Sequence, residues 1–254
     1  KGAGAVTGQA LQTAAAAPVA PGAAANVCGT NFGVDLSTNL QGDNNSYVLS
    51  PSRQGGCDNL IDIDTGAAWP TTPVTTADTL TFRRASVFTN AAPTANVLEL
   101  CTTRISGRLQ SDATACSAAP VGRLSNLIVD TYYVDRNSGQ QAGLPALRRK
   151  TLSAAGALQF ADQEIIAGIE DMQVQFGIDP TGNTGIATRY VNPNAVPASA
   201  QIISVRVWLL VRADTAEQGF TATNIYQYGD RLQATGVTGD LDRAAGSGHA
   251  YPPS

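Results

Sequence analysis

Histidine is nearly absent from this chain, because the single one, His249, stands in a Gly/Ser-rich tail. Nucleophilic sites of the Ser-His-Asp and Cys-His types need an ordered imidazole as the base. Zinc sites usually take histidine or several close thiolates. The sequence disfavours both kinds of site. We expect a protein that is not an enzyme and has no catalytic residue, cofactor or bound metal, although carboxylate-only chemistry stays open at this point.

Charge is also scarce, since charged residues make up 14% of the 254 residues and the formal net charge is −4. No surplus of basic residues is present to neutralise phosphates, so the sequence disfavours nucleic-acid binding. No run approaches the roughly 20 apolar residues of a membrane-spanning helix. Met172 is the only methionine. We therefore interpret the chain as a processed or truncated product, with Lys1 either a natural cleavage site or a chosen boundary.

The four cysteines show none of the C-x-x-C spacing expected of a metal knuckle or a thioredoxin-like site. An even count in a chain rich in Thr, Asn and Gly favours two disulfides in an oxidising compartment. Three pairings are possible. The pairing Cys28–Cys57 with Cys101–Cys116 is favoured, because sequential pairs close short loops worth on the order of 3 kcal/mol each. The alternative is four reduced, buried cysteines.

The first 25 residues differ in composition from the rest of the chain. Residues 1–25 read as an Ala/Pro-rich helix remnant followed by a linker, because Pro18 and Pro21 stop any helix. Residues 26–254 are interpreted as one β-rich head domain. Its first part, residues 26–73, is rich in Gly and Pro and reads as a long loop.

The clearest strand pattern is Ile202 to Ala213, where apolar residues alternate with a mixed surface. Strict alternation predicts a strand with one face on a core. The apolar face contains Ile203, Val205, Val207, Leu209 and Val211. We expect this to be a central strand, and on that premise Val207→Asp should abolish soluble expression.

Weaker patterns surround this strand. Residues 172–178 alternate as a half-buried strand, and residues 162–168 are compatible with one helical turn capped by Asp162. Residues 146–152 read as the return strand of a hairpin, with Arg148, Arg149 and Lys150 exposed along a solvated edge. Together the patterns predict an α+β fold dominated by antiparallel β-sheet.

Six segments, taken in order, resemble one family, the PilW-type minor pilins of type IV pilus systems. They are DTLTFRRAS at 78–86, YYV…SG…PALRR at 132–149, EIIAGIEDMQVQFGID at 164–179, TRYVNP at 188–193, SVRVWLLVRAD at 204–214 and YQYGD at 226–230. Each motif alone is weakly specific, whereas the ordered set over residues 78–230 is fairly specific. The GAGAVTG near Lys1 resembles the place where the family's long N-terminal helix gives way to the head.

The resemblance implies a pilin-like head whose long N-terminal hydrophobic helix is missing here or reduced to a remnant. Members are made as prepilins, cleaved and N-methylated, and held in the inner membrane as a periplasmic precursor until assembly. The implied role is structural: initiation of pilus assembly and the tip complex, at the extracellular end of the fimbrium. The implied partners are other minor pilins, the major pilin and a large tip adhesin, so a part in cell adhesion is expected.

Two local features bear on contacts and ions. Arg206, Trp208 and Arg212 lie on the mixed face of the central strand and form a candidate interface, since Trp and Arg are enriched at binding hot spots. The alternative is that Trp208 packs under a loop. The family's D-x-D-x-D-G turn is reduced here to Asp179, Thr181 and Asn183, and this departure puts Ca²⁺ binding in doubt.

Three other interpretations remain open at this point. A J-type pseudopilin of a type II secretion system would share the architecture. A freely secreted β-rich adhesin would share the composition. A carboxylate-dependent glycan hydrolase needs two acids about 5 to 10 Å apart. Glu170 and Asp171 would point to opposite faces of a strand, and Asp130 and Asp135 show no sign of convergence.

Overall fold

The computed structural model describes residues 28, 32–36, 38–47, 49, 57–102, 107–111, 116, 122–153, 159–215, 218 and 228–230. The helix remnant and linker expected at residues 1–25 lie outside these residues, as does His249. Where the chain is described, it is dominated by antiparallel strands, so that part of the expected fold class is confirmed. None of the described helical segments is both long and apolar enough to cross a membrane.

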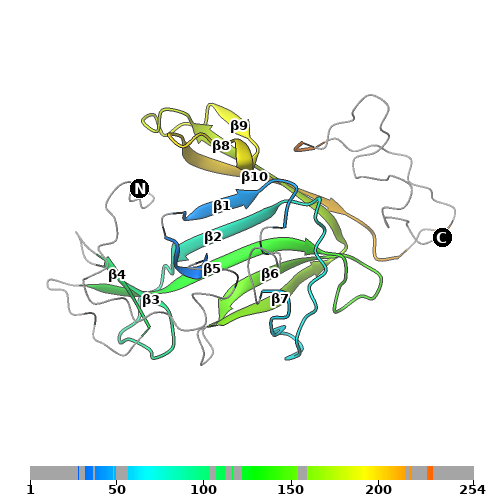
Figure 1. Ribbon diagram of the computed structural model, residues 1–254, viewed down its shortest axis with the longest axis horizontal. Helices are drawn as coiled ribbons and strands as arrows, with labels where there is room; N and C mark the ends of the chain where they lie inside the picture. The colour runs from blue at the N-terminus through cyan, green and yellow to red at the C-terminus, as the bar shows by residue number, and fades with distance from the viewer. Residues whose placement is uncertain are drawn as a thin grey trace.

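The larger of two sheets has seven strands (Figure 1). They are β1 (Leu40–Asp43), β2 (Thr79–Ala85), β3 (Glu99–Thr102), β4 (Gly107–Gln110), β5 (Arg123–Asp135), β6 (Ala146–Ser153) and β7 (Gln159–Ala167). The order β1-β2-β5-β3-β4 branches at β5, which also pairs with β6, and β6 pairs with β7. Two 3₁₀ turns, η2 (Phe32–Val34) and η3 (Pro193–Ala195), complete the described elements.

The smaller sheet has the order β10-β8-β9, with β8 at Ile169–Asp179, β9 at Arg189–Val191 and β10 at Gln201–Val211. The chain passes from one sheet to the other at Gly168, whose φ is +84°. A Cβ there would lie 2.8 Å from the carbonyl oxygen of Arg212. Only glycine suits this corner, because it tolerates positive φ and leaves room for the close backbone.

Strand β5 separates two hydrophobic clusters, because successive side chains of a strand point to opposite faces. Leu127, Val129 and Tyr133 belong to the first cluster, together with Cys28, Phe32, Tyr47, Leu49 and Cys57. Val134 belongs to the second, together with Met172, Val174, Phe176 and Ile178 of β8. The smaller sheet therefore packs against the larger one through the β8 side chains in the second cluster.

The expectation that Ile202–Ala213 contains the central strand is wrong, because β10 is an edge strand. Val207 lies opposite Val174 of β8, yet Val207 is 44% exposed and Val174 only 1%. The core covers β8, and β10 lies at its margin. Because Val207 is not buried, we no longer expect Val207→Asp to abolish soluble expression.

The helical turn expected at residues 162–168 is also wrong. The segment is the second half of β7, which pairs antiparallel with β6. Asp162 does not act as a helix cap, since its carboxylate is fully buried and bonds to Arg148, Lys150 and Tyr133. The pairing of β7 with β6 therefore outweighs the local sequence pattern that favoured a helical turn.

Candidate interaction surface and its supports

Two aromatic rings flank one arginine on the smaller sheet. The guanidinium carbon of Arg206 lies 3.8 Å from the ring centre of Tyr190 and 5.6 Å from that of Trp208. Arg206 and Tyr190 are exposed, and Trp208 is half-buried. The Ser204 hydroxyl donates to the Tyr190 oxygen, and this bond, with Arg206, lowers the pKa of Tyr190. We call Tyr190, Arg206 and Trp208 the aromatic–arginine stack.

Arg212, the third expected interface residue, does not join this stack. Its side chain pairs with Glu170 at 3.5 Å and donates to the Gly143 carbonyl at 2.7 Å. Its backbone N–H bonds to Gly168 at 2.7 Å. Arg212 therefore ties the end of β10 to the corner between the sheets. Tyr190 contacts Arg206 instead, and the sequence analysis did not predict this contact. The available signal was that Tyr190 lies in the TRYVNP segment, two residues after Thr188.

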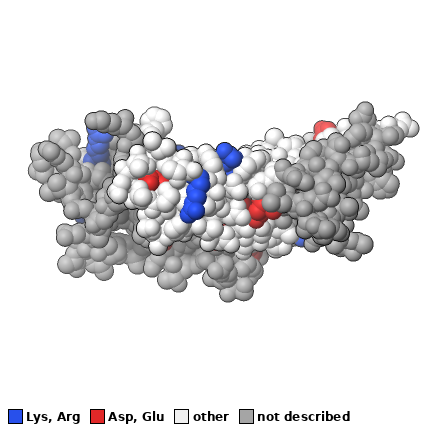
Figure 2. All heavy atoms as spheres, turned by 90° about the horizontal axis from the view of Figure 1, so that it is seen from above, with Lys and Arg blue, Asp and Glu red and all other residues white. Residues whose placement is uncertain are grey.

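Seen from above, the described surface of the molecule is largely uncharged, with isolated basic and acidic residues (Figure 2). On and near the smaller sheet, five large apolar side chains are each at least 37% exposed. They are Ile186, Ile203, Val207, Leu209 and Val211. Four of them, all but Ile186, lie on β10, and exposed apolar side chains gathered on one strand mark a candidate interaction surface.

The turn after β8 is closed by its own hydrogen bonds. The Asp179 carboxylate accepts bonds from the N–H and hydroxyl of Thr181, the N–H and hydroxyl of Thr184, and the N–H of Gly185. These donors hold the pKa of Asp179 below its usual value, Thr184 most of all. A cation would have to displace them. Over the residues that the structure describes, no cluster of three or more His, Cys, Asp and Glu is arranged to hold a metal.

Residues 228–230, part of the YQYGD motif, join the two sheets, and we call them the C-terminal clip. Tyr228 donates to Asp171 of β8 at 2.8 Å. Asp230 accepts from the amides of Asn44, Asn45 and Asn192 at 2.8, 2.7 and 3.2 Å. Gly229 between them has φ +58°, and a Cβ there would lie 2.7 Å from the Gln173 Cβ. The contacts at this junction between the sheets therefore explain why the motif has tyrosine, glycine and aspartate at positions 228, 229 and 230.

Asp78 lies beneath this junction. It is 1% exposed and accepts hydrogen bonds from the N–H groups of Asn45 and Val174. Burial, together with the nearby Asp230 and Asp171, raises the pKa of Asp78 to about 7 in spite of these bonds. The folded protein therefore retains a proton on Asp78 at pH values where the unfolded chain has lost it.

We expect the free energy of unfolding to fall as the pH rises from about 5 to about 7, by roughly 1 kcal/mol per unit from Asp78. The contribution is complete below the unfolded pKa and is lost as the pH passes the folded pKa of about 7. Urea denaturation of wild type and Asp78→Asn over this range checks it. The slope should flatten in the variant, and an equal slope would show that another group titrates.

A buried ion network occupies one end of the face that carries the first cluster. Arg148 of β6 contacts three carboxylates, at 2.7 Å to Asp162, 2.9 Å to Glu164 and in close contact with Asp62. Its guanidinium carbon lies 3.7 Å from the Trp69 ring centre. These partners raise the pKa of Arg148, although burial opposes them.

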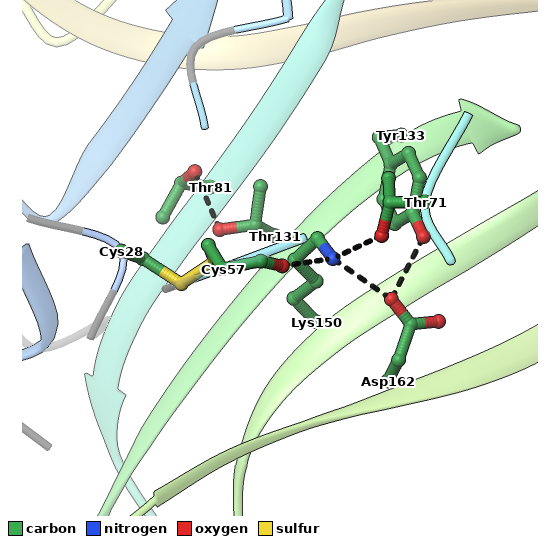
Figure 3. The surroundings of a disulfide bond; sticks show 8 residues. All are labelled: Cys28, Cys57, Thr71, Thr81, Thr131, Tyr133, Lys150 and Asp162. Carbon is green, nitrogen blue, oxygen red and sulfur yellow. Dashed lines mark hydrogen bonds and ion pairs between the residues drawn. A yellow bond between two sulfur atoms is a disulfide. The ribbon is translucent and has the colours of Figure 1, made fainter. Parts of the chain in front are cut away.

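Lys150 connects this network to the disulfide region (Figure 3). Its ammonium group donates to the Cys57 carbonyl at 2.6 Å, the Thr71 hydroxyl at 2.9 Å and Asp162 at 3.0 Å. Tyr133 donates to the same Asp162 oxygen at 2.7 Å. Burial lowers the pKa of Lys150, and Asp162 opposes that shift.

The expected exposure of Arg148 and Lys150 is therefore wrong, since both are 0% exposed. Strand β6 is an interior strand between β5 and β7, and only Arg149 lies on the other face. A signal existed in the sequence. Arg148 and Lys150 stand two apart, as do Asp162 and Glu164, so both pairs share a face when the strands align.

All four cysteines are paired as the sequence favours. Cys28 bonds to Cys57 with Cα atoms 4.7 Å apart, and Cys101 bonds to Cys116 with Cα atoms 5.6 Å apart. The first bond is buried and holds the loop that delivers Cys57 to Lys150. The disulfides therefore stabilise the fold.

The acidic residues considered for hydrolysis do not form one site. Glu170 and Asp171 are neighbours on β8 at a register shift in its pairing with β10, and their carboxylates have different partners. Asp171 bonds to Tyr228, and Glu170 pairs with Arg212. Asp130 accepts from Thr151, whereas Asp135 accepts from Thr72 and Trp69. Each carboxylate thus has a local structural partner.

The described part of the chain is thus an antiparallel β protein with two disulfides and an aromatic–arginine stack at its surface. Residues 131–245 match the family model of type IV pilus-assembly protein W. The match covers slightly less than half of the chain and supports a type IV pilus-related protein. No curated protein and no solved structure matches the chain. The matched part contains the stack, β6 to β10 and the C-terminal clip.

Proposed function

We propose that the chain is the head of a structural minor pilin, which contributes to initiation of pilus assembly and to the tip complex through protein–protein contacts. The observation that carries the proposal is the match of residues 131–245 to the pilus-assembly family. The protein acts without catalysis, outside the inner membrane, after its precursor has been processed. Its partners are other minor pilins, the major pilin and a large tip adhesin.

The aromatic–arginine stack is the proposed contact surface. Arg206 and Tyr190 are exposed, and Trp208 presents a half-buried ring beside them. Rings and guanidinium groups of this kind supply large contact area at low entropic cost and dominate many interfaces. The ion network, the disulfides and the C-terminal clip keep the underlying sheets rigid. Partner binding then requires little rearrangement of the head.

Replacement of Trp208 by alanine in the full-length gene should weaken binding to the partner pilins by about 2 kcal/mol, or roughly 30-fold. Arg206→Ala should act in the same direction. The measurements are surface pili recovered by shearing from a strain that carries only the variant, and capture of the other minor pilins by the tagged protein. Deletion of the gene should abolish or strongly reduce surface pili.

Phe88→Ala is the matched control, because Phe88 is an aromatic residue that is 79% exposed and lies outside the smaller sheet. It should leave both readouts unchanged. Normal piliation of the deletion strain would contradict the proposed function. Normal piliation and normal capture with Trp208→Ala, in a strain where deletion is deleterious, would contradict only the proposed surface.

A further inference from the structure

Strand β10 has one edge with no partner strand in the described part of the chain. It pairs with β8 along its length, and the order β10-β8-β9 places it at the margin of the smaller sheet. A free edge exposes unpaired backbone N–H and C=O groups that can pair with another strand. Proteins commonly protect such edges with proline or lysine. The sequence of β10, QIISVRVWLLV, contains neither, and Arg206 is its one charge.

Four apolar side chains of β10 are exposed, and we call them the exposed apolar row: Ile203, Val207, Leu209 and Val211. Their exposed fractions are 37%, 44%, 44% and 64%. Val205, which stands between them in sequence, is half-buried and packs against the second cluster. Single exposed apolar residues need no explanation, but four of them on one strand with a free edge indicate a surface that another strand covers. The edge supplies hydrogen bonds and the row supplies apolar area to the same partner.

The part of β10 that pairs with β8 without a register shift is short, so its central residue can be identified. Register shifts occur between Ile202 and Ser204 and between Leu210 and Val211. The unbroken segment is therefore 204–210, and its central residue is Val207. A strand that pairs antiparallel with a copy of itself aligns its regular segments fully only when the two-fold axis passes through that central residue.

We propose that β10 pairs antiparallel with β10 of a second copy of this chain, about a two-fold axis through Val207. Position 205 then faces position 209 of the other copy, and Val207 faces Val207. Arg206 stands opposite Trp208 of the other copy, so the register places no two like charges opposite each other. The two small sheets join into one six-stranded sheet.

The sequence of β10 is complementary to itself in this register, and that property singles out a second copy as the partner. Apolar residues oppose apolar residues on one face, and the only charge opposes a ring on the other. An axis through Arg206 would instead place two guanidinium groups opposite each other, which is unfavourable. Pairing of seven residues per copy buries less than the roughly 1,200 Å² of a stable interface. The dimer is therefore weak and concentration-dependent. It does not depend on a role in the pilus.

Sedimentation velocity of the purified 254-residue chain tests the proposal between about 1 and 200 μM, the range in which weak interfaces of this size assemble. The wild-type protein should shift from monomer towards dimer. Val207→Lys and Val207→Glu should each remain monomeric, because the axis places like charges against each other. An equimolar mixture of the two variants should dimerise again, because lysine then faces glutamate.

Ile186→Lys is the control, since Ile186 is 66% exposed and lies outside β10; this variant should dimerise like wild type. Circular dichroism should show that each Val207 variant is folded. A wild-type chain that is monomeric throughout would overturn the proposal. A dimer that persists in Val207→Lys, or a mixture that stays monomeric, would overturn the pairing or its register. Binding of a different pilin head that Val207→Lys blocks, with no self-association, would assign the edge to another partner and also overturn it.

Discussion

Asp162→Ala is expected to lower the free energy of unfolding by about 3 to 5 kcal/mol. Asp162 is 0% exposed and bonds to the side chains of Arg148, Lys150 and Tyr133 at 2.7, 3.0 and 2.7 Å. Without its carboxylate, a buried ammonium group loses its only ion-pair partner within 4.0 Å among the described residues. The cost is large because an uncompensated charge then remains in the interior.

Equilibrium denaturation in urea measures this effect. Asp64→Ala is the matched control, because Asp64 lies in the loop that contains Asp62 but is exposed. The Asp64 backbone N–H, which donates to Asp62, is retained in that variant. The control should change the stability by less than about 0.5 kcal/mol. A similarly small change for Asp162→Ala would show that the network does not stabilise the fold.

The second large effect is expected on loss of the Cys28–Cys57 disulfide. Cys28→Ser with Cys57→Ser should destabilise the protein by about 3 to 4 kcal/mol, because the bond closes a loop with a sequence separation of 29. Removal of Cys101–Cys116, with a separation of 15, should cost about 0.5 kcal/mol less. Urea denaturation of the two double variants gives the comparison. An unreduced wild-type mass equal to the reduced mass, rather than about 4 Da below it, would refute both bonds.

The two effects should not add. The Cys57 carbonyl accepts from Lys150 at 2.6 Å, and Lys150 pairs with Asp162. Loss of the disulfide frees the backbone that presents this carbonyl, so the network is already weakened when Asp162 is removed. A double-mutant cycle between the disulfide and Asp162 should therefore give a coupling energy of about 0.5 to 3 kcal/mol. Strict additivity would show that the disulfide and the network are independent.

Local sequence was sufficient to predict β8 and β10 and it favoured the observed cysteine pairing, but it did not predict β7. The alternation at residues 172–178 and 202–211 predicts two strands, and both form. The short separations of Cys28–Cys57 and Cys101–Cys116 favoured the observed pairing. These features depend on residues that are close in sequence. The ordered motifs pointed to the type IV pilus, and the match over residues 131–245 supports that relation.

The position of each strand was decided only by tertiary structure. Alternation shows that β10 has an apolar face, but not whether anything covers that face. β8 takes the central place because the corner at Gly168 turns it onto the second cluster, where Met172, Val174 and Phe176 are 1 to 2% exposed. β10 follows as its outer neighbour, and its apolar row stays exposed.

The buried charges also show the difference between what the local sequence predicts and what the tertiary structure decides. A basic run on a strand is usually solvated, so local pattern favoured exposure of Arg148 and Lys150. Two of their partners come from distant segments: Asp62 is 86 residues from Arg148, and Cys57 is 93 residues from Lys150. Tyr190 likewise meets Arg206 only because β9 and β10 flank β8. Strand periodicity is a local property of the chain, whereas burial and contact depend on what the fold brings from far away in sequence.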